Sequence, residues 1–199
     1  MTPRLQKLFD LLQQAGLAPV ERLGELTIEV PPAAYLSTCQ KLRDAPELRF
    51  EQAIDLCGVD YSTYGGARAP RGGRFAVVLH LLSISHNWRL RVRCVIAEAE
   101  VPLLPSLVEV WPNVNWFERE AFDLFGIGFA GHPDLRRILM PDEWSGHPLR
   151  KEYPLEGNPG DHVQYREVGT AEHVYRYDKA AIRGFGWKKE VEKTGTGKG

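Results

Sequence analysis

The sequence predicts an α+β fold: a two-layer domain of helices on a mixed sheet, followed by a long extended C-terminal arm. Helical and strand-like hydrophobic periods alternate up to residue 127 of the 199-residue chain, ending in a strand-rich stretch and a helix. Beyond residue 127 the sequence shows no regular hydrophobic periodicity and is rich in proline and glycine. We therefore expect a core domain at 1–127, an arm at 128–160 and a tail at 161–199 that lies on a partner, since so long a stretch without its own core needs a surface.

The N-terminal third predicts two helices around one strand. A first helix follows from leucines at helical spacing, Leu5, Leu8, Leu11 and Leu12. Gly16 suits its end. Residues 25–30, ELTIEV, alternate as a half-buried strand does, and the Pro31-Pro32 pair opens a helix that runs to about Arg43.

The middle of the chain predicts three strands, at 52–61, 75–84 and 88–96, with residues 62–74 as a mobile hairpin loop. In the last strand the apolar side chains face one way, and three arginines, Arg89, Arg91 and Arg93, face the other. Like charges in a row repel unless acidic groups lie nearby. Glu25 and Glu29 of the first strand can supply those groups within the same sheet. The favoured interpretation is a solvated face of the sheet, and the alternative is that the arginines form a partner surface.

Two helices complete the predicted domain. Residues 101–112 contain a short helix with Ser106 as its N-cap. Residues 113–127 form an amphipathic helix, on whose exposed face Arg119 and Asp123 suit a surface ion pair.

Glu118 is an exception because it projects within the apolar arc of this helix. Its spacing from Asn115 favours a capping box, with Asn115 as N-cap. Two other interpretations stay open: a buried general acid or base, and a clamp on Arg136 or Arg137 of the following loop.

Composition excludes several classes of protein. A net charge of −1 creates no field that attracts nucleic acid or a membrane. The three cysteines, Cys39, Cys57 and Cys94, form no CxxC pair for zinc or an iron–sulfur cluster, and we expect reduced thiols in the cytoplasm. The longest apolar run, 75–84, is too short to cross a bilayer. No nucleophile elbow, Walker loop, GxGxxG or HExxH motif occurs.

The tripeptide Gly-His-Pro occurs twice, at 131–133 and at 146–148. Glycine permits a bend, and proline restricts the histidine before it to extended conformations, so each copy predicts a stiff elbow. A ring nitrogen of each histidine can bond a backbone carbonyl and fix the elbow's angle. The alternative is a metal site, or a metal-dependent hydrolase, built from His132, His147 and nearby carboxylates. The spacing lacks the local pairing of ordinary zinc motifs.

Residues 118–154 closely resemble the C-subunit signature of respiratory NADH–quinone oxidoreductase, complex I. We call residues 131–154 the signature segment. The residues that carry the resemblance, and that we expect at a subunit interface, are Glu118, Arg119, Glu120, Asp123, Phe125, Gly126, His132, Pro133, Leu135, Arg136, Arg137, Ile138, Leu139, Trp144, Gly146, His147, Pro148, Arg150, Lys151, Tyr153 and Pro154.

The resemblance implies a non-redox structural subunit of the peripheral arm, on the cytoplasmic side of a bacterial inner membrane. In that family the FMN, the iron–sulfur clusters and the quinone belong to other subunits. The tail lies along the D-subunit, which shapes the quinone cavity and which we call the quinone-site subunit. The complex passes electrons from NADH to quinone and pumps protons. An equivalent component of a membrane-bound hydrogenase or another related complex is the alternative.

The resemblance also suggests how the segment docks on the quinone-site subunit. Basic side chains would supply charge-assisted hydrogen bonds across the interface, from Arg136, Arg137, Arg150 and Lys151. Apolar side chains would anchor it, namely Leu135, Ile138, Leu139 and Trp144, with the tryptophan as the expected hot spot. No catalytic residue, bound cofactor or metal is expected in this chain.

Overall fold

The computed structural model describes residues 1–64, 72–97 and 100–154, which belong to one compact unit, Met1–Glu156. The predicted tail at 161–199 and the last residues of the predicted arm lie outside the described residues. The division into a core, an arm and a tail therefore stays a prediction.

The elements alternate as an α+β fold requires. The helices are α1 (Pro3–Gln14), α2 (Tyr35–Asp44), which follows the short 3-10 turn η1 (Pro32–Ala34), and α3 (Val114–Phe125). Five strands form the main sheet: β1 (Pro19–Arg22), β2 (Glu25–Glu29), β3 (Gln52–Asp60), β4 (Phe75–Ser83) and β5 (Trp88–Ile96). A small parallel pair joins β6 (Leu103–Pro105) to β7 (Gly128–Ala130).

The main sheet has the order β1-β2-β5-β4-β3 and is mixed, because β2 runs parallel to β5 while the other neighbours are antiparallel. Thr27 lies opposite Arg91, and Glu29 lies opposite Arg93. Glu25 pairs with Arg91 and Glu29 with Arg93. The prediction that the first strand neutralises this arginine row is confirmed for these two arginines.

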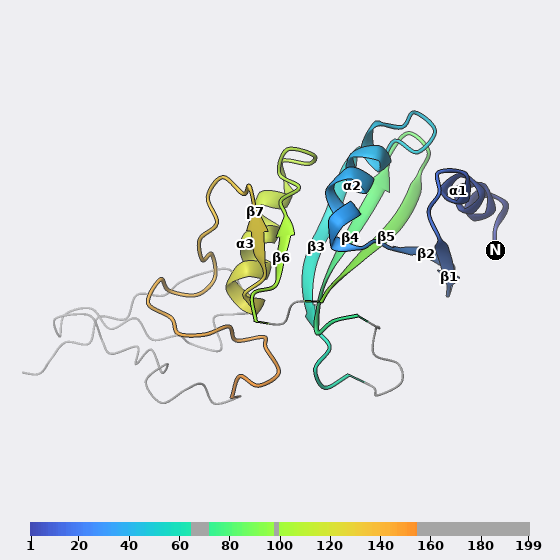
Figure 1. Ribbon diagram of the computed structural model, residues 1–199. Helices are drawn as coiled ribbons and strands as arrows, with labels where there is room; N and C mark the ends of the chain where they lie inside the picture. Colours follow the sequence, from blue (N-terminus) through green and yellow to red (C-terminus); the bar gives the residue numbers. More distant parts are fainter. Residues whose placement is uncertain (65–71, 98–99, 155–199) are drawn as a thin grey trace, which may run out of the picture. The chain divides into compact units, whose positions relative to one another are not determined.

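One face of the sheet carries the core. On β5 the buried side chains alternate with the arginines, as predicted. The apolar residues of this face pack in one cluster with residues of all three helices, among them Leu8, Tyr35, Cys39, Leu42 and Ala121. Figure 1 shows α2 over the sheet, and α3 beside β6 and β7. The α+β class, with three helices and a mixed five-stranded sheet, is therefore confirmed.

The predicted short helix at 101–112 is wrong. Residues 103–105 instead form β6, which Pro102 and Pro105 favour because proline disfavours helix for the residue before it and lacks an N–H. Residues 108–110 form only a hydrogen-bonded turn, so Ser106 caps no helix, although its Oγ accepts from the Val108 amide at 3.2 Å. The short strands β1 and β7 were not predicted, since three or four residues are too few to show a period.

Candidate functional site: a clamped segment on α3

The two Gly-His-Pro elbows fix the signature segment to opposite ends of α3. Gly131 has φ +84° and Gly146 has φ +83°, the left-handed conformation that glycine permits. The His132 Nε2 donates to the carbonyl of Asn115 at 3.2 Å, near the start of α3. The His147 Nδ1 donates to the carbonyl of Asp123 at 2.9 Å, near its end. The structural-elbow interpretation is confirmed.

The same geometry contradicts a shared metal site at the two histidines. Asn115 and Asp123 are eight residues apart in α3, which is roughly 12 Å along the axis. Burial, together with the charges of Arg150 and Arg137, lowers the pKa of His147 despite its bond to the Asp123 carbonyl. In the described ranges, no three histidine, cysteine or acidic residues converge as a metal site would require.

Asp123 is the main clamp between α3 and the signature segment. Its Oδ1 accepts from Arg137 Nη1 at 2.7 Å. Its Oδ2 accepts three successive backbone amides, those of Ile138 at 3.0 Å and of Leu139 and Met140 at 2.8 Å. Burial by itself would raise the carboxyl's pKa, but these hydrogen bonds outweigh it and hold the pKa below its ordinary value.

The predicted surface ion pair between Arg119 and Asp123 is therefore wrong, because Asp123 is fully buried. Arg119 donates instead to the carbonyls of Arg136 at 3.2 Å and Arg137 at 2.9 Å. Its guanidinium also lies 5.4 Å from the ring centre of Trp116. Both charged residues thus hold the backbone of one loop, where a simple helix pattern suggested an exposed pair.

Arg137 links the first half of the segment to the second. Its Nη2 donates to the carbonyls of Trp144 at 2.8 Å and Gly146 at 3.1 Å, while its Nη1 holds Asp123. The sequence left open that Glu118 clamps an arginine of this loop. That interpretation is wrong, because Asp123 is the residue that binds Arg137.

Glu118 is buried, but it holds a different loop. Helix α3 begins at Val114 with Asn113 as its N-cap, so Asn115 lies inside the helix and the predicted capping box is wrong. Glu118 Oε2 accepts from Ser106 Oγ at 2.6 Å, and Oε1 accepts from the Leu107 amide at 2.7 Å. Burial raises the pKa of Glu118 to about 7, against the lowering effect of these two bonds. His132 Nε2 lies 4.0 Å from its Oε2.

A second clamp, at Asp60, was not predicted. Asp60 ends β3, is nearly buried, and accepts from Arg74 Nη2 at 2.7 Å and from the amide of Lys151 at 3.0 Å. The pKa of Asp60 lies well below its usual range, because hydrogen bonds from Arg74, Lys151 and Ser62 overcome the opposing effect of burial. Arg74 also pairs with Glu152. The one available signal was an acidic residue at the end of the strand, just before the glycine-rich loop.

Arg150 closes the segment over the end of α3. Its Nε donates to the carbonyl of Phe125 at 2.7 Å, and its guanidinium lies 5.0 Å from the ring centre of Phe75. A Cβ at Gly126 would lie only 2.5 Å from His147 Nε2 and 2.6 Å from Arg150 Nη2. Gly126 has φ +72° and ends α3, so this glycine serves both the helix end and the close approach.

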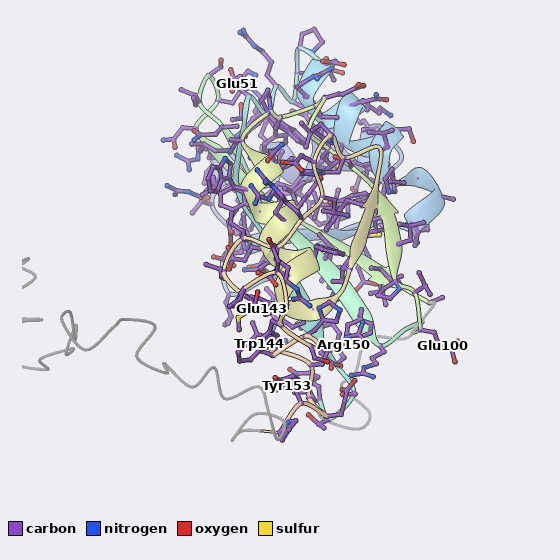
Figure 2. All side chains as sticks on the ribbon, turned by 90° about the vertical axis from the view of Figure 1, so that its left-hand side faces the viewer. Glu51, Glu100, Glu143, Trp144, Arg150 and Tyr153 are labelled. Atoms are coloured by element: carbon purple, nitrogen blue, oxygen red, sulfur yellow. The ribbon has the colours of Figure 1, made fainter. Side chains whose placement is uncertain are left out.

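The remaining expected interface residues are partly or largely exposed. Leu139 is 61% exposed and Leu149 is 47% exposed. Trp144 is half-buried, and its indole N–H has no partner within the described part of the chain. Figure 2 shows Trp144, Arg150 and Tyr153 together near one end of the unit, with Glu51 at the opposite end. The others with exposed or half-buried side chains are Glu120, Phe125, Pro133, Leu135, Arg136, Ile138, Pro148, Lys151 and Pro154.

Comparison with known proteins places this segment in a family. The family model described as "Respiratory-chain NADH dehydrogenase, 30 Kd subunit" matches residues 28–159. The NADH-quinone oxidoreductase C-subunit of Bordetella pertussis is 56% identical over 167 residues, which cover 79% of this chain and 81% of the relative. The C-subunit of Paraburkholderia xenovorans is 58% identical over 161 residues, with 79% and 80% covered.

Solved structures agree at the level of the fold. A chain from the structure of the membrane-bound sulfane sulfur reductase, an archaeal respiratory membrane complex, has a TM-score of 0.63 and 17% identity, with 88% of this chain and 96% of that chain covered. The identity to the curated relatives and the matched family model decide the assignment. This chain belongs to the C-subunit family of NADH-quinone oxidoreductase and is part of the complex I peripheral arm.

Proposed function

We propose that the chain is a non-redox structural subunit that docks on the quinone-site subunit through the outer surface of the signature segment. The complex it serves passes electrons from NADH through FMN and iron–sulfur clusters to quinone and translocates protons. One observation carries the docking proposal: the segment is fixed from within by buried carboxylates, while its leucines at 139 and 149 stay exposed.

The clamps suit a docking role because they order the segment before a partner arrives. Binding costs less when side chains and loops do not have to be ordered at the same time. The basic residues divide between the two tasks: Arg137 is engaged within the chain, whereas Arg136 and Lys151 are exposed. We therefore assign the partner contacts to Arg136, Lys151, the exposed leucines and Trp144, whose indole N–H has no partner in the described part of the chain, and not to Arg137.

Two of the three cysteines support the proposal that the iron–sulfur clusters are held by other subunits. Cys39 and Cys94 are buried in the core. Burial raises the pKa of the Cys94 thiol to about 12 and that of Cys39 further. Iron–sulfur ligation requires thiolates, which these environments disfavour.

The proposed location is the cytoplasmic face of the inner membrane, reached through partner subunits. None of the helices in the described ranges is long and apolar enough to span a bilayer. Membership in a respiratory membrane complex supports peripheral attachment.

The test is a gentle-detergent purification of the complex from membranes through a tag on this chain. We expect the quinone-site subunit and NADH:quinone reductase activity to co-purify. Leu139→Asp combined with Leu149→Asp should reduce both, while the isolated variant keeps its melting temperature, because both side chains are exposed. Ile84→Asp is the matched control, since Ile84 is also exposed (63%) but lies in the turn between β4 and β5. Normal assembly of the double variant would contradict docking through this surface.

A further inference from the structure

The tip of the β1–β2 hairpin breaks two local rules at once. Arg22 of β1 lies opposite Glu25 of β2 in the strand register, so Leu23 and Gly24 form a two-residue turn. Both have positive φ, +55° and +82°. Such turns prefer Asn-Gly or Asp-Gly, because a left-handed conformation is unfavourable for residues like leucine. In the turn between β4 and β5 the left-handed position is indeed an asparagine, Asn87. Leu23 is moreover 93% exposed.

A residue that is strained, apolar and exposed at the same position points to a functional contact. The surface around Leu23 has the same character. Val20, on β1 of the same hairpin, is also exposed. A cavity of about 390 Å³ lies beside the turn, lined by Gly24 of the turn and by Thr2, the N-cap of α1. Leu23 therefore lies at the rim of a concave site.

The cavity combines apolar walls with positive charge. Leu5, Leu8 and Trp88 supply the apolar part, and Arg4 and Arg89 supply two guanidinium groups. No acidic residue lines it. Within the residues that the structure describes, no hydrogen bond, ion pair or ring contact engages either guanidinium. Both therefore remain available to a carboxylate, in contrast to Arg91 and Arg93 of the same strand, which are paired with glutamates.

The backbone of β1 does not suit the addition of another strand. β1 is the edge strand of the sheet and has four residues, which begin with Pro19. Short edge strands with proline and charged residues oppose pairing by a further strand, because proline lacks the N–H donor. Recognition at this edge must rest on side chains: the leucine knob, the apolar cavity and the two arginines.

We propose that this β1 edge is a second docking surface, which takes a segment of a second neighbour in the complex, one that carries a carboxylate beside an aliphatic side chain. Charge complementarity argues for this occupant, since an acidic group would neutralise the unpaired arginines while the aliphatic group enters the cavity. The matched family model begins at residue 28, so α1, β1 and Leu23 lie outside it.

The position of the surface gives it a distinct role. β1 and β3 are the opposite edges of the main sheet, and α3, which carries the signature segment, packs on β3. Figure 1 shows α1 and β1 at one end of the sheet and α3 at the other. With one docking surface at each edge, the chain holds two neighbours at a set distance.

The experiment uses the complex purified through a tag on this chain, with Leu23 replaced by the photo-crosslinking residue p-benzoylphenylalanine. We expect irradiation to join this chain to one other subunit, different from the one captured at the signature segment. Mass spectrometry should place the cross-link in a segment that contains aspartate or glutamate. Arg4→Glu with Arg89→Glu should lower the yield about fivefold, because two attractions become repulsions. Arg4→Lys with Arg89→Lys should retain most of it.

Lys7→Glu is the matched charge control, because Lys7 is an exposed residue of α1 that does not line the cavity. It should leave the yield unchanged. The inference is overturned by the absence of an intersubunit cross-link, by a cross-link to a second copy or to this chain itself, or by a yield that charge reversal does not lower. The inference rests on membership in the complex, and recovery of the quinone-site subunit from the same sample shows whether the first docking surface is intact.

Discussion

The clearest test of the clamped segment is Asp123→Asn. The substitution keeps the size of the side chain but removes its charge. One carbonyl oxygen then has to serve Arg137 or the three amides of residues 138–140, and the new NH2 group points a donor at the other donors. Because Asp123 is fully buried, water cannot replace the lost acceptor without opening the site.

The expected cost follows from the contacts. Removing one partner of a buried ion pair costs about 3–5 kcal/mol. The pair here is not completely dry, because the Arg137 side chain is 16% exposed. We therefore take the lower end, about 3 kcal/mol. This free energy should appear first as local opening of residues 137–146, since α3 and the sheet keep their own packing.

Hydrogen exchange followed by mass spectrometry measures that opening directly. The amides of Ile138, Leu139 and Met140 should exchange about 100-fold faster in Asp123→Asn, which corresponds to about 3 kcal/mol. Asp134→Asn is the matched control, because Asp134 lies in the same segment but pairs with Arg136 at the surface. It should change exchange less than threefold, as exposed pairs are worth under about 1 kcal/mol.

The pH dependence gives the same test a second readout. The pKa of Asp123 is lower in the folded protein than in the unfolded chain. Its contribution is therefore complete above the unfolded value, about 3.9, and is lost as the pH falls through the folded value. Asp123→Asn should remove this acid-labile part. Equal exchange rates at residues 138–140 in the wild type and Asp123→Asn would refute the clamp.

Three further results are expected. The pKa of Glu118 is raised to about 7, so the unfolding free energy should fall by about 3 kcal/mol as the pH rises from about 4.5 to 7. Urea titrations at several pH values should show this dependence in the wild type and not in Glu118→Gln. Gly126→Ala should destabilise the protein by about 1–3 kcal/mol more than Gly131→Ala in thermal unfolding, since both have positive φ but only Gly126 has His147 in its way. Trp144→Ala should weaken association with the quinone-site subunit about thirtyfold, or 2 kcal/mol, in a binding titration between the two proteins; normal assembly would contradict its role as an anchor.

The core of the fold could be predicted because its signals are periodic. The alternation in residues 88–96 identified both the buried face of β5 and the arginine row, and the leucines of α1 showed a helical repeat. Short elements carry no such signal. β6 was mistaken for a helix because a strand of three residues cannot establish a period, and its pairing with β7 is set by contacts distant in sequence.

The roles of the acidic residues could not be predicted, and only the burial of Glu118 could be read from the helical pattern. Nothing in the sequence distinguishes the carboxylates of Glu118, Asp123 and Asp60, yet each accepts hydrogen bonds from a different set of donors. Helical spacing placed Asp123 on an exposed face, and the signature segment then buried it by folding over that face. A periodic pattern describes a helix by itself and cannot include a loop that returns from later in the chain.

The buried carboxylates explain how an irregular segment can be rigid. A chain without helix or sheet must find other partners for its backbone amides, since a buried N–H without an acceptor is costly. Asp123 accepts three such amides and Asp60 accepts that of Lys151, while Arg119 and Arg137 bind carbonyls of the same segment. These side chains replace the backbone hydrogen bonds of a regular helix or strand. Because the inner side of the segment holds the backbone in place, its outer side can present leucines to a partner. A core strand or helix could present leucines only by exposing the face with which it packs.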